Sequence, residues 1–176
     1  MLDEERIKEA NNNVKRYFKE KLLLRRDPDT DIINTFRINS EDSLKVADYI
    51  FRENLSSLWV IVTSYYSMYY ITNAVLFSLG YKVGDRISHK VTSDALIVYV
   101  RDKLAKNLLE DFETAKYEAM DLNNMSDEII ESFDYERKKR SSFQYDMNTV
   151  VKRTKAGTSL ERAKRFNFEF LKLLGK

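Results

Sequence analysis

The sequence predicts an all-α fold, an up-and-down bundle of five to six helices around one buried central helix. Residues that break helices are scarce, because the 176-residue chain holds four Gly and one Pro. Few positions can therefore end a helix or form the tight turns of a sheet. Apolar residues also recur every three or four positions, as on one face of a helix. We expect a single domain over residues 1–176, with an N-terminal helix and loop over 1–39, a core over 40–150 and a C-terminal helix over 158–175.

The N-terminal part is expected to hold one helix and one loop. Apolar residues between Asp3 and Leu24 form one stripe, which predicts an amphipathic helix. The segment 25–39 contains Pro28 and shows no sustained period, so it is interpreted as a loop. Asn39 or Ser40 is then the expected N-cap of a second helix that runs to about Asn54.

The stretch from Leu55 to Tyr81 carries no formal charge. Its length would suffice to span a bilayer. It is nevertheless dense in Ser, Thr, Asn and Tyr, which suits a central helix enclosed by other helices better than contact with lipid. Gly80 is the expected C-terminal stop of this helix.

The next predicted helix begins with Ser88 as its cap. It continues, or restarts after a kink, as far as Met120, and residues 121–125 are expected to form a loop.

Two helices are expected in the C-terminal part. Ser126 opens a long helix that Gly157 ends. Thr158 and Glu161 have the spacing of a capping box, which predicts that a last helix starts there and ends at Gly175.

Composition excludes several kinds of chemistry. The chain has no Cys and one His, His89, which removes disulfides, thiolate catalysis, sulfur-ligated metals and paired-histidine metal sites. We expect no cofactor and no metal. The net charge of +2 indicates a surface of mixed sign, and the charged N-terminus does not resemble a signal peptide. The expected location is cytoplasmic, without a membrane association.

Two arginines and an amide lie on a helical stripe that should face the core. Arg137, Arg140 and Gln144 share one third of the circumference with apolar residues. A buried guanidinium requires an anionic or hydrogen-bonding partner, and its planar fork suits phosphate. The alternative is that both arginines pair with acids of neighbouring helices. Lys138 and Lys139 extend the run to four adjacent cations but are expected to point away from the stripe, as on a solvated face.

Other clusters allow a functional and a structural interpretation. The tyrosines of the central helix are core residues or, alternatively, a surface on which bases stack. A basic cluster near Gly157 could meet nucleic acid, or be a solvated face; it comprises Lys152, Arg153, Lys155, Arg162, Lys164 and Arg165.

Three short motifs resemble those of the small stand-alone HEPN proteins of bacteria and archaea. They are Ser64-Tyr65-Tyr66 with Leu79-Gly80, Ser88-His89-Lys90, and Arg140 to Tyr145 with Asp146 after it. The similarity covers roughly residues 40–150, and it implies a HEPN-like helical bundle.

The resemblance also implies a function. Many HEPN proteins are metal-independent endoribonucleases that act as homodimers, and others pair with a minimal nucleotidyltransferase as toxin and antitoxin or in defence. It implies Arg140 and Tyr145 as the catalytic pair. Arg137, Gln144, Lys139, Tyr66 and His89 would contact RNA or nucleotide.

Tyr145 stands where the family has a histidine. A phenol, with a pKa near 10, is a poor general base at neutral pH, which puts the ribonuclease reaction in doubt. His89 could supply the missing imidazole only if the fold brings it close to Arg140. The alternative function is a non-catalytic helical module for protein interaction, with Arg137 and Arg140 serving structure.

Overall fold

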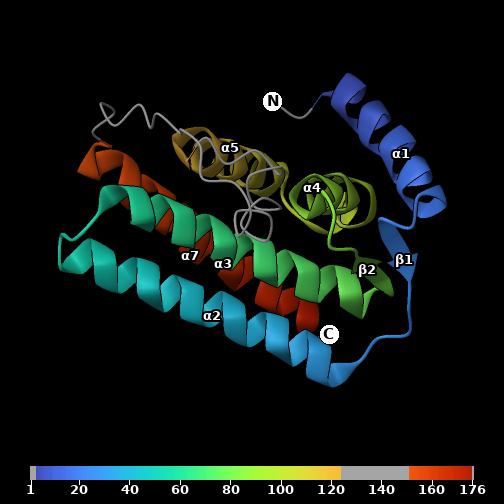
Figure 1. Cartoon of the computed structure of the whole chain (residues 1–176), viewed down its shortest axis with the longest axis horizontal. Coiled ribbons are helices and arrows are strands. Elements are labelled where there is room, and N and C mark those ends of the chain that lie inside the picture. The colour runs from blue at the N-terminus through green and yellow to red at the C-terminus, as the bar shows by residue number, and fades with distance from the viewer. Residues whose placement is uncertain (1–2, 124–150, 176) are drawn as a thin grey trace, which may run out of the picture.

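A computed structural model describes residues 3–123 and 151–175 of the chain (Figure 1). This part is mostly helical and confirms the all-α helical bundle. Its α-helices are α1 (Glu4–Lys19), α2 (Thr30–Arg52), α3 (Ser57–Ser78), α4 (Ser88–Tyr99), α5 (Lys106–Asn123) and α7 (Arg153–Leu174). A 3-10 turn, η1 (Arg101–Lys103), and two short antiparallel strands, β1 (Leu23–Arg25) and β2 (Tyr81–Val83), complete the described part.

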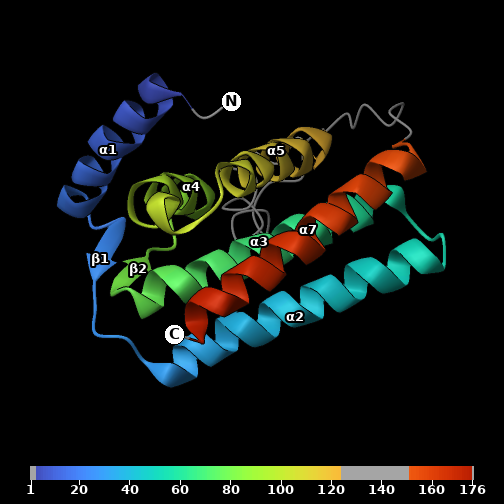
Figure 2. The same cartoon turned by 180° about the vertical axis from the view of Figure 1, so that it is seen from behind.

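Helix α3 occupies the centre, as the uncharged segment predicts. It packs against α2, α7, α5 and α4, and most of its side chains are buried. Helix α2 runs antiparallel to α3, and α7 runs parallel to α3. Helices α4 and α5 cover another side of α3 (Figures 1 and 2). Ser56 caps the N-terminus of α3 by accepting a hydrogen bond from the Trp59 amide. After the helix, Gly80 takes a left-handed φ of 86°, so it forms the expected stop.

A buried hydrogen-bond network joins the three long helices. Ser40 of α2 donates to the Ser67 carbonyl oxygen of α3 at 2.7 Å and also contacts the Asn167 side-chain oxygen of α7. The Asn167 amide donates to the Ser67 hydroxyl at 2.7 Å and to the Ala163 carbonyl at 3.0 Å. These groups are buried, and satisfying them fixes how the helices pack against one another.

Helix α1 lies at the periphery and is held by a buried carboxylate of α4. Asp94 accepts hydrogen bonds from the Tyr17 hydroxyl at 2.8 Å and the Asn13 amide at 3.0 Å. The Arg6 guanidinium lies 2.7 Å from its other oxygen and 3.6 Å from Glu113 of α5. Because Asp94 is fully buried, it depends on these partners.

The structure corrects the N-terminal predictions. The predicted first helix ends at Lys19, and Leu23–Arg25 instead forms β1, which pairs with β2. The predicted loop over 25–39 is wrong from Thr30 onward, because α2 starts there with Asp29 as its cap. Neither Asn39 nor Ser40 caps a helix; both lie within α2.

The middle of the chain is closer to prediction. Ser88 is the first residue of α4 rather than its cap, since the cap position is Ile87, which has a left-handed φ of 44° and no side-chain hydrogen bond. Of the two alternatives, continuation or a restart after a kink, the structure shows the restart, because η1 separates α4 from α5. The predicted loop over 121–125 is wrong for 121–123, which belong to α5; the rest of it lies outside the described residues.

Gly157 does not end a helix, and Thr158 and Glu161 do not start one. Both predictions are wrong, because α7 runs without a break from Arg153 to Leu174. A Cβ at Gly157 would lie 3.2 Å from the Phe51 ring of α2, so this glycine permits close helix packing. The predicted end at Gly175 is confirmed, because it is the C-cap of α7. The predicted helix over 126–150 lies outside the described residues.

None of the helices in the described ranges combines the length and hydropathy needed to cross a membrane.

Replacing Asn167 tests the network between α2, α3 and α7. Asn167→Ala should lower the free energy of unfolding by about 2–4 kcal/mol, because it leaves a cavity and buried hydroxyls without their partner. Urea denaturation measures the loss. Asn39→Ala, on the exposed side of α2, is the control and should change stability by less than about 0.5 kcal/mol. Equal effects of the two substitutions would contradict a structural role for the network.

Candidate functional site

Tyrosines of α3 surround the single histidine at the start of α4. The Tyr65 hydroxyl lies 2.7 Å from His89 Nδ1, within hydrogen-bond distance. The rings of Tyr69 and Tyr66 lie 4.5 Å and 5.7 Å from the imidazole, between ring centres. Tyr70 extends the cluster, with its ring 6.0 Å from that of Tyr66. We call Tyr65, Tyr66, Tyr69, Tyr70 and His89 the Tyr-His cluster.

Helical spacing accounts for the tyrosine half of the cluster. Tyr65 and Tyr69 lie four residues apart, as do Tyr66 and Tyr70, so each pair extends along a neighbouring face of α3. His89 lies in the first turn of α4, immediately after the left-handed residue Ile87. One turn further along, the side chains of Thr92 and Asn73 approach within 3.3 Å and hold α4 against α3.

His89 is buried, with 4% of its surface exposed. Burial, reinforced by the positive charge of Lys116, lowers the pKa of the imidazole from its ordinary 6.5 to about 4. His89 is therefore neutral near pH 7, and one of its ring nitrogens can donate a hydrogen bond while the other can accept one. Burial also raises the pKa of the Tyr69 phenol. A neutral imidazole among tyrosine rings favours ring packing and hydrogen bonding over a charged role.

The structure brings together some of the predicted site residues. Tyr66 is partly buried and contacts His89 edge to face, so the first two motifs of the HEPN resemblance meet in space. The remaining candidates, Arg137, Lys139, Arg140, Gln144 and Tyr145, lie outside the described residues, and their roles stay predictions.

Comparisons with models of protein families, with curated proteins and with solved structures found no match.

Most of the basic cluster near Gly157 is paired within the protein. Arg162 lies 2.8 Å from Glu118 of α5 and 3.5 Å from Asp111, and Arg165 also contacts Asp111. Lys164 lies 3.0 Å from Asp48 of α2. These pairs join α7 to its neighbours, which favours the structural interpretation of the cluster over nucleic-acid binding.

The described residues contain no group of three or more His, Asp or Glu side chains placed to hold a metal ion. Sequence reasoning did not identify the Asp94 network, because Arg6 and Tyr17 are far from Asp94 in the sequence and no local spacing links them.

The lowered pKa of His89 predicts how stability depends on pH. An unfolded imidazole with a pKa near 6.5 takes up a proton between pH 6.5 and 4, whereas folded His89, with a pKa of about 4, does not. Acidification through this window therefore favours the unfolded state. Urea denaturation should show that lowering the pH from 7.5 to 5.0 costs about 2 kcal/mol through this group.

His89→Gln is the control for this prediction. The same change of pH should lower the stability of the variant by about 2 kcal/mol less than it lowers that of the parent protein. Since the chain has one histidine, the difference is assigned to His89. Parallel curves for the two proteins would contradict a buried, neutral imidazole.

Proposed function

We propose that this chain is a HEPN-type module that binds RNA or nucleotide next to the Tyr-His cluster. The observation that carries the proposal is the contact between two separate motifs, seen in the 2.7 Å distance from the Tyr65 hydroxyl to His89 Nδ1. Both motifs belong to the resemblance, so their meeting supports it. Partly buried aromatic rings such as Tyr66 offer a face on which a base can stack.

Charge for the phosphate would come from Arg140, with Arg137, Lys139 and Gln144 as further contacts. A guanidinium can donate two parallel hydrogen bonds to a phosphate. In this proposal the Tyr-His cluster positions the base and Arg140 binds the phosphate of the RNA or nucleotide. The module would act as a homodimer, as half of a toxin-antitoxin or defence pair with a minimal nucleotidyltransferase.

We propose binding rather than hydrolysis as its principal activity. Tyr145 replaces the histidine of the HEPN motif, and a phenol is a poor general base at neutral pH. The burial and low pKa of His89 make it an unsuitable substitute. A metal-independent endoribonuclease reaction would need a base from elsewhere.

Tyr66→Ala tests the stacking surface. Fluorescence anisotropy with a labelled single-stranded RNA should show binding weakened roughly 5- to 150-fold, the range for loss of one stacked base. Tyr66→Phe keeps the ring and should retain most of the affinity. Tyr49→Ala is the matched control, because Tyr49 is an exposed tyrosine of α2, outside the cluster. Equal affinities of Tyr66→Ala and the control would exclude stacking at Tyr66.

Arg140→Ala tests the phosphate contact. Removal of a charge-assisted hydrogen bond should weaken RNA binding roughly 10- to 100-fold and lower its salt dependence. Lys138→Ala removes a neighbouring cation predicted to point away from the stripe, and its effect should be smaller. The proposal is wrong if Arg140→Ala binds RNA and nucleotide as the parent protein does while remaining folded.

The interaction module remains the second candidate, because large apolar side chains are exposed where α2 passes into α3. Leu55 is 65% exposed and Trp59 is 52% exposed, and such side chains are enriched at protein interfaces. This candidate predicts that Trp59→Ala abolishes association with a protein partner without changing RNA affinity. Loss of RNA binding in Tyr66→Ala and Arg140→Ala would instead favour the HEPN-type function.

A further inference from the structure

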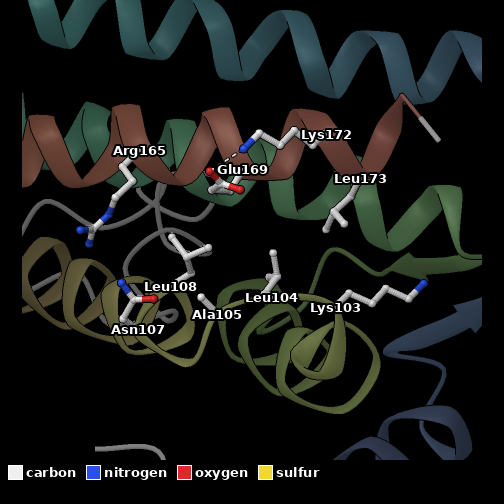
Figure 3. A pocket seen from close by; sticks show the side chains of 9 residues that line it. All are labelled: Lys103, Leu104, Ala105, Asn107, Leu108, Arg165, Glu169, Lys172 and Leu173. Atoms are coloured by element: carbon white, nitrogen blue, oxygen red, sulfur yellow. Dashed lines mark hydrogen bonds and ion pairs between the residues drawn. The ribbon is translucent and has the colours of Figure 1, made fainter.

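A groove lies between α7 and the segment that joins α4 to α5 (Figure 3). Its volume is about 400 Å³, within the roughly 300–1,000 Å³ typical of small-molecule sites. The groove is formed by η1, α5 and α7, whereas the Tyr-His cluster belongs to α3 and α4, so the two places are separate. Its lining comprises Lys103, Leu104, Ala105, Asn107, Leu108, Arg165, Glu169, Lys172 and Leu173.

The middle of the groove is apolar. Leu104 and Leu108 extend from one side and Leu173 from the other, into the space between the helices (Figure 3). Leu108 is buried, while Leu104 and Leu173 are partly exposed. An apolar ring or chain placed here would remove the exposed parts of these side chains from water, which stabilises the complex.

The rim of the groove is basic. Lys103 and Arg165 stand toward opposite ends, and Lys172 lies between them (Figure 3). The three cations face one lining carboxylate, Glu169, so the lining carries an excess of two positive charges.

Existing ion pairs neutralise only part of this charge. Lys172 donates to Glu169 at 2.7 Å. Arg165 pairs with Asp111, because Arg162, the other cation near Asp111, lies 3.5 Å from it and closer to Glu118, at 2.8 Å. Lys103 forms no ion pair with any residue of 3–123 or 151–175. A bound anion would therefore complement charge that the described residues leave uncompensated.

We infer that this groove binds a small organic phosphate ester, with its apolar or aromatic body against the three leucines and its phosphate at the Lys103 end of the rim. A phosphate monoester is anionic near neutral pH, so it would complement the charge of Lys103, which has no ion pair with residues 3–123 or 151–175. This site is independent of the proposed RNA-binding function.

Isothermal titration of the full chain with 1-naphthyl phosphate tests the site, because this probe joins an aromatic body to a phosphate. The control ligands, 1-naphthol and inorganic phosphate, each carry one of the two parts. The ester should bind at least about tenfold more tightly than either control, since only it uses both the apolar floor and the rim. Affinity should also fall with added salt.

Variants locate the binding. Lys103→Gln should weaken the ester about three- to tenfold, whereas Arg165→Gln, at the opposite end of the groove, should have a smaller effect. Ala105→Trp should weaken binding further by filling the groove. Lys82→Gln, an exposed lysine of β2 outside the groove, is the matched control and should leave affinity unchanged. Circular dichroism and melting temperature establish that each variant is folded.

Three results would overturn the inference. They are the absence of saturable binding of the ester, equal affinity for the ester and one of the control ligands, and an affinity that the folded groove variants leave unchanged. Loss of RNA binding in Tyr66→Ala or Arg140→Ala bears only on the proposed function, so the two proposals can fail separately.

Discussion

A long helix without formal charge must be enclosed on nearly every side, and this requirement governs the arrangement of the protein. Helix α3 meets it by packing against α2, α7, α5 and α4. Its polar side chains then need partners inside the bundle, because an unpaired buried polar group is costly. The Ser40, Ser67 and Asn167 network serves the side toward α2 and α7, whereas Tyr65 and Asn73 find partners on α4.

The same enclosure shapes the candidate site. Tyr65 is buried, and its hydroxyl pairs with an imidazole that is itself removed from water. Burial keeps His89 neutral, so the Tyr-His cluster is aromatic and hydrogen-bonding in character, without a cation of its own. This chemistry suits recognition of a base, and any phosphate contact must come from elsewhere in the chain, for which the sequence offers Arg137 and Arg140.

Sequence reasoning succeeded where a pattern depends little on its surroundings. The absence of charge from Leu55 to Tyr81 predicts a central helix whatever its neighbours are. The start of α2 was predicted ten residues too late, because Pro28 favours a loop over 25–39 and Ser40 suits an N-cap. The Ser40 hydroxyl instead pairs with Ser67 and Asn167, which are distant in the sequence. Gly157 was taken for a helix end because its packing partner, Phe51, belongs to another helix.

The functional sites depend on contacts between segments that are distant in the sequence, which local patterns do not predict. The resemblance to HEPN proteins names Tyr66 and His89 as site residues, but it did not predict the contact between Tyr65 and His89. Spacing within one helix cannot place a residue of another. The groove between α7 and the start of α5 was not predicted, because the two segments that line it are far apart in the sequence.

The most direct test of this account follows the nitrogen resonances of the single histidine by NMR from pH 8 to pH 3. Burial against the α3 tyrosines predicts an imidazole that is neutral at pH 7 and titrates with a pKa of about 4. Replacing Tyr65 by Phe should shift the nitrogen resonances of His89 at pH 7. An imidazole that titrates near 6.5, as it does in water, and ignores this replacement would contradict the account.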